Sequence, residues 1–189
     1  MSFQRPVDSF LPQQHRELLD LELYMARRVN EERGALGLRA LACHALLAAV
    51  ARAHSAEMRD LGYFAHESPT PRFATPGDRY EYAFGTRSRF LAENVSCRKW
   101  QSRCAPVSED VPNSVVRACN RLRNRMAPPL SPLPLLLPTQ GDVEESHLGL
   151  MRSPGHRANI LEPTVDIMGI GIVNRGRNLW VTQMFAWRQ

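Results

Sequence analysis

Apolar residues recur at helical spacing through the first third of the chain. Between residues 14 and 33 they lie three or four positions apart, which predicts a helix that ends at Gly34. A second apolar stripe ends at Gly62 and consists of Leu46, Leu47, Val50, Ala53, His54, Met58 and Leu61. Because His54 lies on this stripe, we interpret it as a core histidine whose ring is satisfied by a hydrogen bond.

Two shorter elements are expected in the middle of the chain. A capping threonine followed by proline predicts a third helix that starts at Thr75 and Pro76. We expect Arg79 of this helix to form a structural ion pair rather than a clamp for a substrate. Residues 89–95 then form a short strand or turn that presents Glu93.

The last quarter of the chain combines one more helix with two strands. Residues 143–151 keep a helical pattern. Residues 168–173 and 180–187 are two apolar segments joined by a turn-rich connector at 174–178, which is typical of an antiparallel hairpin. Helices first and a closing hairpin indicate the α+β class.

Two segments fall outside these patterns. Residues 1–13 are polar and interrupted by proline, and we expect an extended N-terminal arm. Residues 98–141 form an atypical insertion, with one plausible helix at 114–126 and a Pro- and Leu-rich stretch at 127–138. Three arginines of that helix follow one another at four-residue steps: Arg117, Arg121 and Arg125. We interpret this stripe as a solvated face, with an anion-binding surface as the alternative.

Composition narrows the class of protein. The 189 residues suffice for one sizeable core, and the hydrophobic share of 43% is that of a globular protein. No apolar run approaches the roughly 18 residues of a membrane span. The first residues lack the features of a signal peptide, which leaves two alternatives: the protein is not exported, or a signal peptide has been removed. The net charge of +5 comes almost wholly from arginine and favours anionic contacts, although we expect no nucleic acid.

The chain contains four cysteines: Cys43, Cys97, Cys104 and Cys119. They allow three fully paired connectivities and show no Cys-x-x-Cys spacing of the kind found in zinc or redox sites. Cys97 and Cys104 are close enough in sequence to close a small loop.

The run from Met151 to Leu161 is the most distinctive in the chain. Ser153 is an N-cap candidate, Pro154 suits the first helical position, and His156 falls in the first turn. This order of Ser, Pro, Gly and His is needed neither by a plain core helix nor by a loop. We therefore expect a function for it beyond packing.

Two other short runs offer functional side chains. His66 lies in the run Phe-Ala-His-Glu-Ser-Pro, and Glu93 lies in the run Ala-Glu-Asn-Val. Ser68 stands beside a proline and is better explained as a cap than as a nucleophile, and the same holds for Ser153. We place His44 and His147 on predicted helices, at the surface.

Together with residues 169–172 and 180–185, these runs resemble the CAP superfamily, also called the SCP domain. The family comprises cysteine-rich secretory proteins, insect antigen 5, plant pathogenesis-related proteins and bacterial relatives. The resemblance is strongest to the bacterial branch and covers residues 17–95 and 143–187.

The resemblance implies a fold and a location. The fold is a three-layer α-β-α sandwich with a small central antiparallel sheet. Residues 14–189 are then a single CAP domain that carries the insertion at about 98–141. The extracellular habit of the family implies a secreted or cell-envelope protein, and it also favours a disulfide between Cys97 and Cys104.

The resemblance also implies a central cleft in which His66, Glu93 and His156 face one another. The further glutamate of eukaryotic members is replaced here by Ser153. Two neutral imidazoles, from His66 and His156, suit zinc or another divalent cation. Glu93 could complete the ligand set, orient a water or only hydrogen-bond to His66, and the alternative to a metal site is a polar cluster that joins loops.

The leading functional hypothesis is a non-enzymatic binding scaffold that recognises an external partner through this cleft. One alternative is a metal-assisted hydrolase with Glu93 as the general base. Another is a binder of lipid headgroups or an anionic cell-surface component, which would use the arginine stripe of the insertion. The resemblance also implies lipid or sterol as a candidate partner.

Overall fold

A four-stranded sheet in the order β1-β3-β4-β2 forms the middle layer of the protein. The structure is a computed structural model and describes residues 16–99 and 137–187. The strands are β1 (Ala42–Cys43), β2 (Leu91–Lys99), β3 (Ile167–Arg175) and β4 (Asn178–Ala186). The long strands β2, β4 and β3 pair antiparallel, whereas β1 pairs parallel to β3. The sheet is therefore mixed rather than purely antiparallel. The sequence did not predict this, because the two-residue β1 is too short to show a pattern.

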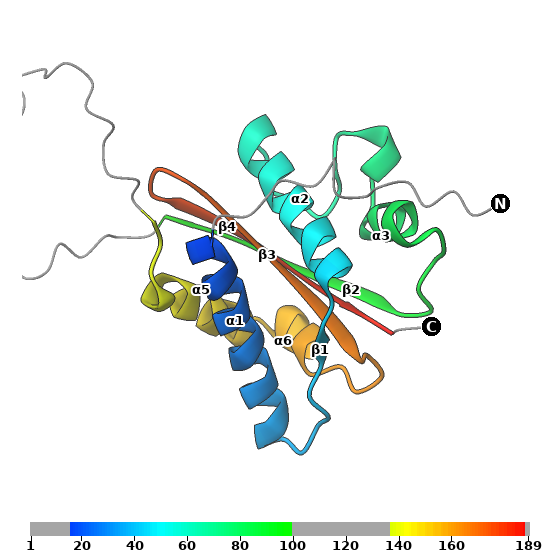
Figure 1. The fold of residues 1–189 in the computed structure, drawn as a ribbon, viewed down its shortest axis with the longest axis vertical. Coiled ribbons are helices and arrows are strands. Elements are labelled where there is room, and N and C mark those ends of the chain that lie inside the picture. The colour runs from blue at the N-terminus through cyan, green and yellow to red at the C-terminus, as the bar shows by residue number, and fades with distance from the viewer. Residues whose placement is uncertain (1–15, 100–136, 188–189) are drawn as a thin grey trace, which may run out of the picture. The chain divides into compact units, whose positions relative to one another are not determined.

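Helices cover both faces of this sheet (Figure 1). They are α1 (Arg16–Ala35), α2 (Ala45–Leu61), the 3-10 turn η2 (Pro71–Phe73), α3 (Pro76–Phe84), α5 (Gln140–Arg152) and α6 (Pro154–Ile160). One core cluster joins α1, α5 and α6 to residues such as Met168 and Ile170 of β3. A second joins α2 and α3 to Ile167 of β3 and Met184 of β4. Neighbouring residues of β3 thus point to opposite faces, as expected for a strand buried on both sides, and the predicted α-β-α sandwich is confirmed.

Two glycines allow α2 to lie directly against β3. A Cβ atom placed on Gly169 would lie 2.3 Å from the backbone carbon of Leu47, and one on Gly171 would lie 2.1 Å from the backbone nitrogen of Arg52. Ser55 of α2 uses this close approach to donate a hydrogen bond to the carbonyl oxygen of Gly171 at 3.1 Å. The Gly-Ile-Gly-Ile run of β3 is therefore a packing requirement.

Local signals determine where several elements begin and end. α3 starts at Pro76 as predicted, and Thr75 and Asp78 form a capping box at its start. β3 and β4 extend further than predicted, so their turn is only Gly176 and Arg177. Gly176 has a φ of 57°, which suits the first central residue of a type II′ turn.

Two histidine predictions are corrected by the structure. His147 is 0% exposed, whereas we expected it at the surface. Val143, His147 and Leu150 share one face of α5, so the spacing of buried neighbours was a signal for this burial. His44 is not inside a helix but is the N-cap of α2, where its ring accepts a bond from the N–H of Leu47 and packs against Phe84.

Several other predictions fall outside the described residues. These concern the arm at 1–13, the helix at 114–126 with its arginine stripe, Cys104 and Cys119. At the two ends of the predicted insertion, residues 98–99 belong to β2 and residues 140–141 to α5. Cys97 is exposed, and its pairing with Cys104, which lies outside the described residues, stays a prediction.

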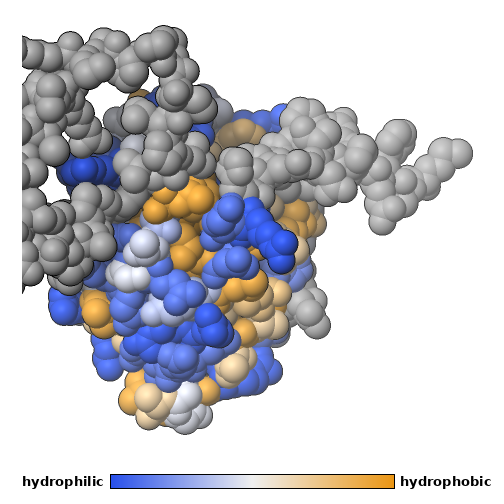
Figure 2. All heavy atoms as spheres, turned by 60° about the vertical axis from the view of Figure 1, so that its left-hand side comes forward, coloured by the Kyte–Doolittle hydropathy of each residue, from blue (hydrophilic) through white to orange (hydrophobic). Residues whose placement is uncertain are grey.

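The face shown in Figure 2 is mostly hydrophilic, with apolar side chains in its upper part, in its middle and along its edges. Among the exposed large apolar side chains are Leu19 and Leu23 of α1, which are 43% and 48% exposed. No helix of residues 16–99 and 137–187 has both the length and the apolar character of a membrane span.

Candidate functional site

The loop between α2 and α3 brings His66 to Glu93 of β2. The Nδ1 atom of His66 lies 3.0 Å from Oε1 of Glu93. The His66 side chain is 44% exposed, whereas that of Glu93 is only 2% exposed. Because a carboxylate only accepts, Nδ1 carries the proton of the neutral ring and Nε2 keeps its lone pair. Glu93 therefore orients the imidazole of His66 and leaves Nε2 available to a ligand.

Arg79 of α3 holds the other oxygen of Glu93. Its Nη2 atom donates to Oε2 of Glu93 at 2.7 Å, and the side chain is 5% exposed, so the predicted structural ion pair is confirmed. The same Nη2 atom donates to the carbonyl oxygen of His66 at 3.0 Å, and Nη1 donates to that of Phe73 at 2.9 Å. Arg79 thus fixes both the carboxylate and the backbone of the loop.

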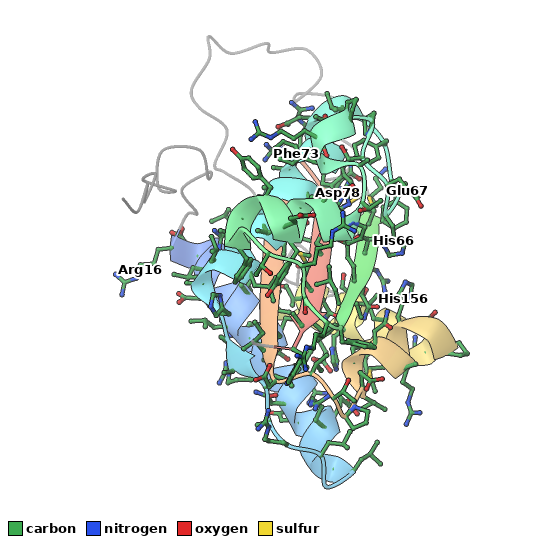
Figure 3. The ribbon with its side chains drawn as sticks, turned by 90° about the vertical axis from the view of Figure 1, so that its right-hand side faces the viewer. Arg16, His66, Glu67, Phe73, Asp78 and His156 are labelled. Carbon is green, nitrogen blue, oxygen red and sulfur yellow. The ribbon has the colours of Figure 1, made fainter. Side chains whose placement is uncertain are left out.

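His156 lies in the first turn of α6, as its sequence predicts. Ser153 occupies the N-cap position, but its hydroxyl makes no capping hydrogen bond. The carbonyl oxygen of His156 accepts a bond from Nδ2 of Asn94 at 3.0 Å, which ties α6 to the strand that carries Glu93. Figure 3 shows His66 and His156 on the same side of the molecule, with His66 above His156.

A network of side-chain amides extends this connection. Asn94 also donates to Oε1 of Gln183 on β4 at 3.0 Å, and Asn159 of α6 donates to Oδ1 of Asn94 at 2.9 Å. Asn94 and Gln183 are fully buried. Sequence reasoning did not assign them a function, because partners so far apart in the chain leave no periodic signal.

The pKa values of His66 and His156 shift in opposite directions. The hydrogen bond that His66 donates to Glu93 raises the pKa of His66 above its usual value, against the effect of burial. Burial lowers the pKa of His156, and the charge of the nearby His66 lowers it further. At neutral pH His156 is therefore the more fully deprotonated of the two imidazoles.

His54 is a core residue, as predicted, but it also lies beside Glu93. It is 1% exposed, and its Nε2 atom lies 3.0 Å from the carbonyl oxygen of Ala65. The same atom lies 3.9 Å from Oε1 of Glu93. Burial lowers the pKa of His54, so its ring is neutral at pH 7.

The donor set available to a cation consists of imidazole nitrogens. Within the described residues, no three or more His, Cys, Asp or Glu side chains lie together so that they could hold a metal ion. Both oxygens of the buried Glu93 are already hydrogen-bonded, so this carboxylate is placed as a partner of His66 rather than as a third ligand. A cation seat at His66 and His156 therefore stays a prediction, and its further ligands would come from water or from a bound partner.

A mixed sheet between two helical layers is the α-β-α architecture that the resemblance to the CAP class implied. The family model described as CAP, cysteine-rich secretory protein family, matches residues 26–185, and the chain belongs to this family. The predicted family is thereby confirmed.

Three bacterial proteins are among those similar to this chain. The chain is 29% identical over 157 residues to the uncharacterized protein YkwD of Bacillus subtilis strain 168, covering 83% of this chain and 44% of that protein. An extracellular protein with an SCP domain from Bacillus anthracis has a TM-score of 0.62 at 22% identity, covering 90% of this chain and 41% of that one. An outer surface protein of Borrelia burgdorferi has a TM-score of 0.58 at 13% identity, covering 90% and 94%. The chain thus spans less than half the length of the first two of these proteins.

Proposed function

We propose that this CAP domain is an extracellular binding scaffold whose cleft seats a divalent cation between His66 and His156. The observation that carries the proposal is the 3.0 Å contact between Nδ1 of His66 and Oε1 of Glu93. A ligating histidine characteristically donates its other ring N–H to a carboxylate, which fixes the tautomer and the ring orientation. His66 has this arrangement without any rearrangement of the loop.

The second imidazole supports the same function. A histidine must be neutral to bind a metal, and the lowered pKa of His156 keeps it neutral at the pH of most extracellular fluids. The backbone of His156 is fixed by Asn94, so this ring too starts from a defined position. A cation bound here would supply a positive charge and open coordination positions at the surface of the cleft.

The geometry favours a scaffold over a hydrolase. A general base must reach the water that it deprotonates. Glu93 is almost fully buried, with one oxygen bonded to His66 and the other to Arg79. This supports a role for Glu93 in orienting His66 rather than in activating a water.

The extracellular location and the external partner are part of the proposal. The similar folds include a protein described as extracellular and one described as an outer surface protein. The external partner is not identified, and the candidates are a lipid, a sterol or an anionic cell-surface component that meets the predicted cleft or the predicted arginine stripe of the insertion.

Zinc titration calorimetry on the full chain tests the cation seat. The parent should bind zinc at pH 7.5 and lose affinity steeply by about pH 5, because protons compete for imidazoles with ordinary pKa values near 6.5. His66→Ala and His156→Ala should each abolish binding. The control is His44→Asn, which removes an imidazole but keeps a side chain that caps α2.

Two results would contradict the proposal. No heat from the parent at high micromolar zinc would leave only a polar cluster that joins loops. Binding that survives in His156→Ala would mean that the cation sits elsewhere.

A further inference from the structure

Glu57 of α2 accepts hydrogen bonds from three hydroxyl groups of the loop that carries His66. Its Oε2 atom accepts a bond from the hydroxyl of Tyr63 at 2.7 Å. Its Oε1 atom accepts bonds from Ser68 at 2.8 Å and from Thr70 at 2.6 Å. One carboxylate therefore holds the loop on both sides of His66.

The ionised form of Glu57 suits this role. Burial raises the pKa of the Glu57 carboxyl, but the bonds from Thr70, Tyr63 and Ser68 outweigh burial and lower it overall. A carboxylate has enough lone pairs to accept all three hydroxyl protons, whereas a glutamine would turn an NH₂ group toward one of the donors. The network thus depends on the acid and not only on the shape of the side chain.

After His66 in the chain, the loop is attached to α2 through Glu57. Two other contacts of the loop lie at His66 or just before it. His54 bonds to the carbonyl oxygen of Ala65, and Arg79 bonds to that of His66. These two contacts fix the backbone at His66 itself. Beyond it, the side chain of Ser68 also accepts from the N–H of Thr70 at 2.9 Å, so the bonds to Glu57 fix a turn that is already formed.

We propose that Glu57 is a positioning residue, which holds residues 63–70 so that His66 presents Nδ1 to Glu93 and Nε2 to the cleft. This inference rests on the proposed cation seat. It assigns to α2 a function in setting the affinity of that seat, although Glu57 itself contacts neither histidine nitrogen of the seat.

The test compares Glu57→Gln with Glu22→Gln in the full chain. Glu22 is a matched control, because it is also a carboxylate that accepts several bonds, from Arg52 and from the N–H of Ile172, but it lies on α1. Both variants should lower the melting temperature. Only Glu57→Gln should also weaken zinc binding, by about 10-fold, as is found for residues that orient metal ligands indirectly.

A metal-free measurement separates this inference from the proposed function. The ¹⁵N shifts of the His66 ring should show the Nδ1–H tautomer in the parent and in Glu22→Gln, and a mixture of tautomers in Glu57→Gln. If the parent binds no zinc but this difference is found, the cation seat fails while the positioning role stands.

The inference would be overturned if Glu57→Gln lowered stability but left both the tautomer and the zinc affinity unchanged. Should that variant not fold, Thr70→Val removes one of the three bonds with little change in shape. It should shift the tautomer and the affinity in the same direction by a smaller amount, and an unchanged His66 in folded Thr70→Val would equally overturn the inference.

Discussion

Arg79 and Glu93 form an ion pair of 2.7 Å between α3 and β2 in which both side chains are almost fully buried. Such a pair contributes little net stability as long as it is intact, because desolvation offsets the attraction between the charges. Its value here is positional, since Arg79 also binds the carbonyl oxygens of His66 and Phe73. The pair therefore connects the loop of His66 to the sheet.

Breaking this pair should be strongly destabilising. Arg79→Met leaves the buried Glu93 without its partner, and we expect a loss of about 3–5 kcal/mol in the free energy of unfolding, measured by urea denaturation. The control Arg72→Met removes an exposed arginine that lies over the ring of Tyr82 and should change stability by less than about 1 kcal/mol. Equal effects of the two substitutions would contradict the positional role of Arg79.

His147 should make stability depend on pH. Burial lowers its pKa, and Arg28 lowers it further. The unfolded chain then takes up the proton first, so this contribution to stability is complete above the unfolded value of about 6.5 and is lost as the pH falls below it. Within the described residues neither ring nitrogen makes a hydrogen bond, the nearest carboxylate oxygen being that of Glu32 at 3.6 Å.

Urea denaturation between pH 7.5 and pH 5 checks this expectation. His147→Leu should show a shallower loss of stability than the parent, and little change at pH 7.5, because no hydrogen bond is removed. His147→Gln also lacks the titrating ring and should show the same shallow slope at lower overall stability. Some slope should remain, since the pKa values of His54 and His156 are lowered as well. Parallel curves for the parent and His147→Leu would contradict the assignment.

The close approach of α2 to β3 should make Gly171 intolerant of a side chain. In Gly171→Ala the new methyl group would overlap the backbone of Arg52, and we expect a loss of about 1–3 kcal/mol in thermal or urea unfolding. Gly34→Ala is the matched control, because its Cβ would meet nothing within 4 Å at the end of α1. There the same substitution should stabilise by about 0.4–1 kcal/mol. A tolerated alanine at Gly171 would mean that α2 can move away from the sheet.

The pairing of Cys97 with Cys104 is open to direct measurement. Peptide mapping of the unreduced protein by mass spectrometry should find the two cysteines linked, and the bond needs Cα atoms within about 7 Å. Cys43 lies on the edge strand β1 and serves as the reference for an unpaired thiol. If Cys97 is recovered as a free thiol from protein purified without reductant, the predicted disulfide is wrong. That result would also weaken the proposal of an extracellular location.

The elements of the fold could largely be predicted from the sequence. The apolar stripes of α1 and α2, the Thr-Pro start of α3 and the closing hairpin depend on neighbours within a few residues, and such patterns are local. The burial of His147 is also encoded locally, by its spacing from Val143 and Leu150, although the polar ring of a histidine favours the surface. β1 was missed because two residues carry no period.

The chain by itself determined which residues offer the chemistry, and the tertiary structure decided which of them meet. His66 and Glu93 are 27 positions apart and belong to a loop and a strand, so no helical or strand period relates them. Only the packing of α3 on β2, through Arg79, brings His66 and Glu93 together. In this packing both oxygens of Glu93 are hydrogen-bonded. The role of Glu57 was even harder to predict from the sequence, because its three hydroxyl donors become partners only when the loop folds back on α2. Local propensities act over a few residues, whereas the geometry of a site depends on contacts whose partners are selected by the burial of the whole core.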